Sequence, residues 1–101
     1  MLARVPRPKP LTLEEVRVAL VGLPGFSLVE GSLRSSFEFE SFGDAFGWMT
    51  RVALVAERLD HHPEWTNAYR RVDVVLRTHD VDALTALDVE LAAAMNRAAG
   101  R

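Results

Sequence analysis

Three segments of the chain carry apolar residues three and four positions apart, a spacing that places them on one face of a helix. Each begins with a hydroxyl residue followed three positions later by an acid, the capping-box pattern of a helix start. These pairs are Thr12 with Glu15, Ser41 with Asp44, and Thr85 with Asp88. The apolar positions are Leu13, Val16, Leu20 and Leu23; Phe42, Ala45, Phe46, Met49, Val52, Ala53, Ala56 and Leu59; and Leu84, Leu87, Leu91, Met95 and Ala98. The pattern predicts three helices, of which the second is long and ends before Pro63.

Four shorter segments have the features of strands joined in two hairpins. Residues 26–29 and 33–40 flank a tight turn at 30–32, and residues 65–69 and 72–78 form the second pair. In 33–40 the apolar positions alternate with polar ones, which turns Phe37 and Phe39 toward the core. The same alternation places His79 at the end of the last strand, where a loop begins. We therefore expect an α+β fold of order α-β-β-α-β-β-α, with a four-stranded antiparallel sheet and three helices packed on one face.

Length and composition fit one small domain over residues 12–101. The chain has 101 residues, 49% of them apolar, a formal net charge of −2 and no cysteine. These values exclude disulfides and thiol catalysis, and they predict a cytoplasmic protein that binds neither nucleic acid nor membrane. Residues 1–11 alternate proline with basic residues, which predicts an extended, poorly ordered and solvated tail.

The three histidines, His61, His62 and His79, are the candidate chemical groups. Histidine is the side chain that most readily exchanges a proton near neutral pH, and acids stand beside each of these three. The set suits general acid/base catalysis. Surface histidines without a role are the alternative that composition favours. A metal site is disfavoured because adjacent histidines direct their side chains apart and no HExxH motif is present.

Several neighbouring residues have simpler explanations. Glu57 could be a helix-flank charge paired with an arginine, and Asp88 could serve only as the third residue of its capping box. Trp65 and Tyr69 are expected in the core or an interface. The stripe around Phe42 is expected to be core or a subunit interface rather than a cofactor site.

The spacing of these residues resembles the pterin-4a-carbinolamine dehydratase family. The residues that carry the resemblance are Glu57, His61-His62-Pro63, Tyr69, Thr78-His79-Asp80 and Asp88, preceded by Phe39-Glu40-Ser41-Phe42 and Ala45-Phe46-Gly47-Trp48-Met49-Thr50-Arg51-Val52-Ala53. It covers roughly residues 12 to 98.

The resemblance implies both a fold and a reaction. Members have a four-stranded antiparallel sheet with helices on one side and form homodimers or homotetramers through a strand edge and the long helix. They act as hydro-lyases that remove water from 4a-hydroxytetrahydropterin, giving quinonoid dihydropterin for tetrahydrobiopterin recycling. The pterin is the substrate, and the resemblance implies no metal and no bound cofactor.

The resemblance also assigns roles to residues. His62 and His79 are expected to be the acid/base pair, while His61 binds near the 4a-hydroxyl and could act on the other 4a epimer. Glu57 and Asp60 would orient the histidines or the ring. Arg77, Thr78, Asp80 and Asp88 would complete the substrate site. Three residues depart from the family pattern at the rim of the site: Arg77, Ala83 and Leu87.

Two other functions fit the same residues. One is an interaction role, in which the helical face binds a transcription factor as in some animal members. The other is a related enzyme acting on another pterin, such as an intermediate of molybdopterin metabolism, with the same histidines.

Overall fold

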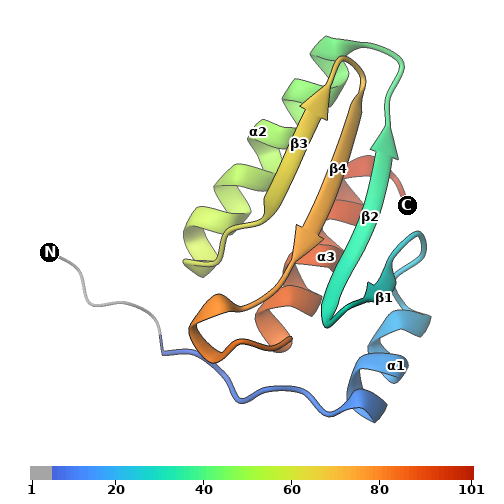
Figure 1. Cartoon of the computed structure of the whole chain (residues 1–101). Helices are drawn as coiled ribbons and strands as arrows, with labels where there is room; N and C mark the ends of the chain where they lie inside the picture. Colours follow the sequence, from blue (N-terminus) through green and yellow to red (C-terminus); the bar gives the residue numbers. More distant parts are fainter. Residues whose placement is uncertain (1–5) are drawn as a thin grey trace, which may run out of the picture.

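The protein folds into one antiparallel sheet backed by helices (Figure 1). The computed structural model describes residues 6–101. The elements are α1 (Leu13–Val21), β1 (Ser27–Val29), β2 (Ser32–Glu38), α2 (Phe42–Leu59), β3 (Glu64–Ala68), β4 (Arg71–Leu76), the short 3₁₀ helix η1 (His79–Val81) and α3 (Ala86–Ala99). The predicted order α-β-β-α-β-β-α is therefore confirmed.

The four strands lie in the order β1-β2-β4-β3, all antiparallel. The central pair is β2 with β4, in which Leu33 lies opposite Leu76 and Phe37 opposite Val72. Helices α2 and α3 pack against each other behind the sheet, while α1 lies beyond the β1 end (Figure 1). This order places the loop after α2 and the loop after β4 at the same end of the molecule, where the histidines lie.

Trp48 is the centre of the core. It is fully buried, its ring centroid lies 4.5 Å from that of Phe37 and 5.9 Å from that of Trp65, and its indole N–H donates to the Met95 carbonyl at 3.0 Å. The predicted alternation of β2 and β4 is confirmed, because Leu33, Phe37, Val72, Val74 and Leu76 are all buried.

The predicted apolar stripe of α2 was too broad. The buried face runs through Ala45, Trp48, Val52 and Ala56, whereas Phe42 and Phe46 are 48% and 56% exposed. A helix with apolar residues on two sides can turn only one of them to the sheet. The tryptophan, which the sequence pattern had left out of the stripe, takes the inner position.

The helices begin largely at the capping residues that the sequence predicts. The capping boxes Thr12 with Glu15 and Thr85 with Asp88 form completely. At α2, the Ser41 hydroxyl accepts from the Asp44 amide at 3.0 Å, which is the first half of the predicted box. His79 begins η1 instead of ending β4, three residues beyond the last residue of that strand.

In the segment before α1, the side chain of Arg7 is buried, although the sequence predicted a solvated tail. Residues 6–11 have neither helix nor strand, but the Arg7 side chain is only 8% exposed and forms ion pairs with Asp60 and Asp80. The Leu11 amide then donates to the Leu84 carbonyl at 2.8 Å. The expectation of a solvated tail is wrong for Arg7, because two carboxylates offer it partners at the end of the sheet. Within residues 6–101, no helix has the length and apolar character needed to cross a membrane.

Candidate active site

The end of α2 positions two of the three histidines. Asp60 closes the helix in the left-handed conformation, with φ 49°, and its amide donates to Ala56 and Glu57 carbonyls. Residues 61–63 then belong to neither a helix nor a strand. The two histidine side chains differ in exposure: His61 is buried, at 5% exposed, whereas the side chain of His62 is 58% exposed.

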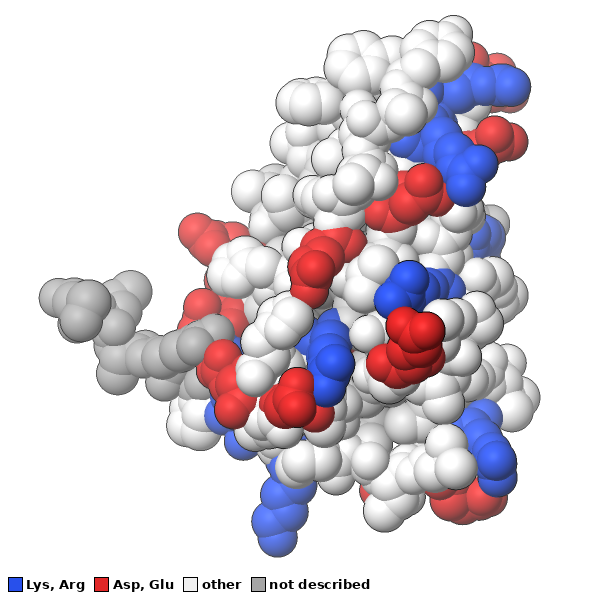
Figure 2. Space-filling view, in the orientation of Figure 1, with Lys and Arg blue, Asp and Glu red and all other residues white. Residues whose placement is uncertain are grey.

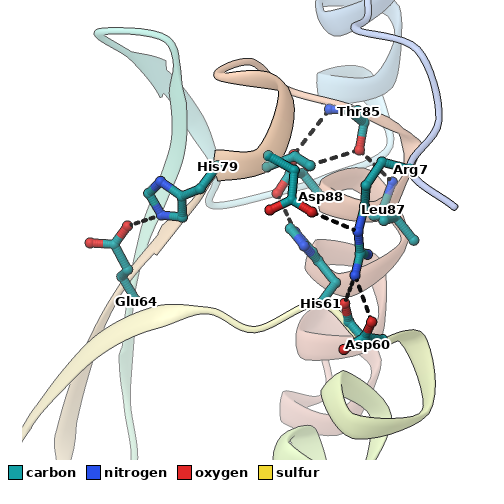
Figure 3. A network of polar contacts seen from close by, with 10 residues as sticks. Arg7, Asp60, His61, Glu64, His79, Thr85, Leu87 and Asp88 are labelled. Atoms are coloured by element: carbon teal, nitrogen blue, oxygen red, sulfur yellow. Dashed lines mark hydrogen bonds and ion pairs between the residues drawn. The ribbon is translucent and has the colours of Figure 1, made fainter. Parts of the chain in front are cut away.

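His61 faces the interior and meets Asp88 of α3. Its Nε2 atom lies 2.6 Å from Asp88 Oδ1, and Asp88 is fully buried (Figure 3). A carboxylate oxygen can only accept, so Nε2 carries the proton of this contact. The contact joins residues 27 positions apart and fixes the orientation of the imidazole ring.

The second oxygen of Asp88 accepts two hydrogen bonds. Oδ2 accepts from the Thr78 hydroxyl at 2.7 Å and from the Thr85 amide at 3.0 Å (Figure 3). The Thr78 and Thr85 hydroxyls are 2.8 Å apart. Asp88 is therefore both a helix cap and the partner of His61. The sequence had left open whether it serves only as a cap, and the structure gives its carboxylate both contacts.

The other two histidines are exposed, and each contacts a glutamate. His62 Nε2 lies 3.2 Å from Glu57 Oε1, and His79 Nε2 lies 2.5 Å from Glu64 Oε1. Glu57 is thus the partner of His62, not of a neighbouring arginine in the described structure. In both pairs the carboxylate accepts a hydrogen bond from Nε2–H. Nδ1 is then the ring nitrogen that remains able to exchange a proton.

A small pocket brings the three histidines together. It has a volume of about 100 Å³ and is lined by Arg7, His61, His62, Arg77, Thr78, His79 and Asp80. The Arg77 guanidinium bonds to the Asp82 carboxylate at 2.6 Å, which holds it at the rim. A larger hollow of about 620 Å³ lies near the start of α2 and the end of α3. No histidine lines that hollow, so the small pocket is the candidate for proton transfer.

All the site residues expected from the sequence therefore meet at one end of the sheet. Six of them line the pocket, while Glu57, Asp60 and Asp88 contact residues that do. Arg7, Glu64 and Thr85 also belong to this cluster, although the sequence patterns did not predict them as site residues. Glu64 could have been found, since the predicted hairpin places it near the end of β4; Arg7 had no such signal.

The described residues 6–101 contain no cluster of three or more histidine, cysteine or acidic side chains arranged to hold a metal. Each imidazole instead has one carboxylate partner. The arrangement places three imidazole rings around a common pocket.

Comparison with known proteins decides the family. The model of the family described as "Pterin 4 alpha carbinolamine dehydratase" matches residues 9–98. The chain belongs to this family. Its members are hydro-lyases, which agrees with the resemblance found in the histidine motif.

Individual relatives agree with this assignment. A protein of Bradyrhizobium sp. (strain BTAi1), provisionally named pterin-4-alpha-carbinolamine dehydratase, is 57% identical over 85% of this chain and 89% of its own. A relative from Bradyrhizobium diazoefficiens with the same provisional name is 54% identical over 85% of this chain and 88% of its own. The crystal structure of a transcriptional coactivator/pterin dehydratase from Brucella melitensis superposes with a TM-score of 0.89 at 48% identity, covering 91% of this chain and 100% of that one.

Proposed function

We propose that this pterin dehydratase family member removes water from 4a-hydroxytetrahydropterin to give quinonoid dihydropterin. The observation that carries the proposal is the meeting of His61, His62 and His79 around one pocket in a chain of this family. The product is the form that a reductase returns to tetrahydropterin, so the reaction serves tetrahydrobiopterin recycling.

The reaction requires two proton transfers at neighbouring atoms. The C4a–O bond breaks as the hydroxyl takes up a proton and leaves as water. The N5–H bond breaks as a base takes that proton, and the electron pair left on N5 forms the C4a=N5 double bond. One proton is given and one is taken, so the pair of catalysts ends with its total proton count unchanged.

His62 and His79 are the acid and the base in this proposal. Both are exposed at the pocket, and both have Nε2 engaged by a glutamate. The glutamates orient the rings and leave Nδ1 for the substrate. Their position on separate elements, one after α2 and one in η1, lets them approach a flat ring from different sides.

His61 has a binding role in this proposal. Its ring is held by the buried Asp88, so it offers a fixed polar group near the 4a-hydroxyl and could serve the other 4a epimer. Thr78 and Asp80 line the same pocket, and Arg77 forms its rim. Asp60 acts through Arg7, which it contacts directly.

Dehydration of chemically generated 4a-hydroxytetrahydropterin in a stopped-flow spectrometer tests the assignment. His62→Ala and His79→Ala should each slow the enzymatic rate by about 10²–10⁴-fold, the range for loss of one general acid or base. The exposed Arg17→Ala serves as a control with an unchanged rate. Near wild-type rates in both folded histidine variants would overturn the assignment.

We further propose that copies of the chain associate through the outer face of α2 as a homodimer or homotetramer. Phe42 and Phe46 are exposed there, with ring centroids 5.8 Å apart. Figure 2 shows an uncharged area at the upper left of the molecule, towards the start of α2, whereas basic and acidic side chains lie at the upper right. An obligate complex with a different protein and no pterin turnover would favour the interaction role instead.

A further inference from the structure

Arg7 is a buried cation in the pocket of the histidines. Its Nη2 atom bonds to Asp60 Oδ2 at 2.8 Å and also to the Asp60 carbonyl, and its Nε lies 3.3 Å from Asp80 Oδ2. Figure 3 shows the side chain descending from the N-terminal segment to Asp60 at the end of α2. The guanidinium therefore links the end of α2 to η1.

Two nitrogens of this guanidinium, Nε and Nη1, are buried without a hydrogen-bond partner among residues 6–101. Nε still has the ion pair with Asp80, so Nη1 is the nitrogen left without an acceptor, and Arg7 lines the pocket with His61, His62 and His79. A buried donor without an acceptor is destabilising, because it has lost its hydrogen bonds to water. Such a group beside a catalytic pocket points to an acceptor that arrives with the substrate.

We propose that Arg7 is a substrate-binding residue that donates a hydrogen bond to the C4 carbonyl oxygen of the pterin. This inference rests on the proposed dehydration. Arg7 lies two residues before the segment matched by the family model, residues 9–98, so the family match does not supply it. The ion pairs with Asp60 and Asp80 orient the guanidinium so that its remaining donor serves the ligand.

The chemistry of the substrate selects this acceptor. Arginine has only donors, so it must meet an acceptor. The pocket is small, about 100 Å³, and the three histidines line it. The edge of the bicyclic ring that enters it must therefore contain C4a and N5, where the histidines act. The carbonyl carbon C4 is bonded to C4a, so its oxygen is the acceptor beside the reacting atoms.

The test compares two ligands that differ at this atom. 6-Hydroxymethylpterin has the 4-oxo group, whereas 2,4-diamino-6-hydroxymethylpteridine has an amino donor there. Calorimetric binding to the full-length protein at neutral pH should favour the 4-oxo ligand by at least about tenfold, and Arg7→Met should abolish most of this preference. Lys9→Met, an exposed change in the same segment, should leave it intact. The KM for dehydration should rise about tenfold in Arg7→Met, while kcat changes less.

A second variant distinguishes the loss of this hydrogen bond from a folding defect. R7K keeps a cation between Asp60 and Asp80 but loses the planar fork that serves several acceptors at once, so it should also lose most of the ligand preference. A wild-type preference retained by either folded variant would overturn the role of Arg7 while leaving the dehydratase in place. A wild-type protein that neither binds the pterin nor dehydrates the carbinolamine would instead overturn the proposed function and, with it, this inference.

Discussion

The Asp88 carboxylate holds His61 through one oxygen and caps α3 through the other. Oδ1 lies 2.6 Å from His61 Nε2, while Oδ2 accepts from the Thr85 amide at 3.0 Å. All of these groups are buried. The pocket wall and the start of the last helix therefore depend on the same side chain.

Asp88→Ala should lower the free energy of unfolding by about 3–5 kcal/mol, because it leaves a buried imidazole, a hydroxyl and an amide without their acceptor. Urea unfolding followed by tryptophan fluorescence measures the change. Thr12→Ala, which removes the exposed cap of α1, is the matched control and should cost about 1 kcal/mol. Equal losses in the two variants would show that Asp88 acts only as a cap.

Glu57→Gln and Glu64→Gln should slow dehydration modestly, since each removes the carboxylate that contacts an imidazole proposed to be catalytic. The exposed contacts are worth up to about 1 kcal/mol, which corresponds to about fivefold in rate. Steady-state kinetics on the carbinolamine measure the loss, with the exposed Glu90→Gln as the control. Losses as large as those of the histidine variants would assign the glutamates a direct part in proton transfer.

Phe46→Glu should shift the protein to a smaller assembly, because a charge on the outer face of α2 opposes burial of that face between copies. Sedimentation velocity across a concentration series measures the mass. Val21→Glu introduces the same charge at an 87% exposed position of α1 and should leave the mass unchanged. A wild-type monomer at all concentrations would contradict the proposed association.

Ser36→Ala should make the free energy of unfolding less dependent on pH in the acidic range. The Ser36 hydroxyl and then the Arg71 guanidinium lower the pKa of the Asp73 carboxyl below its ordinary value. A depressed pKa contributes stability above the unfolded-state pKa and loses it as pH falls through the folded-state value. The variant should therefore be destabilised at neutral pH and match wild type in strong acid. Urea unfolding at both pH values and a carbon-detected NMR titration of Asp73 test this; an unchanged titration would contradict it.

Local patterns made most of the fold predictable. The capping boxes and strand alternation depend on neighbouring residues, and they gave the order of elements and the inward faces of β2 and β4. Choosing the inner side of α2 depends on the sheet behind it. Trp48 and Phe46 are both large aromatic residues that could be buried. Only the contacts with Phe37 and Met95 place Trp48 on the inner side.

The candidate site was predictable where its residues share a motif. The motif of His61, His62 and Pro63 places both histidines directly after the end of α2, as the sequence predicted. The contacts of Arg7 with Asp60 and Asp80 span more than fifty residues, and its proline-rich neighbours have the composition of a solvated tail. No local pattern distinguishes such an arginine from Lys9, which remains exposed.

The shared carboxylate of Asp88 also makes the start of α3 a reporter of the pocket. The Thr85 amide can exchange its hydrogen with solvent only when its bond to Oδ2 opens. A ligand that binds the closed form lowers the population of the opened one. Amide hydrogen exchange at a position remote from the exposed histidines would thus register occupancy of the site without any label on the ligand.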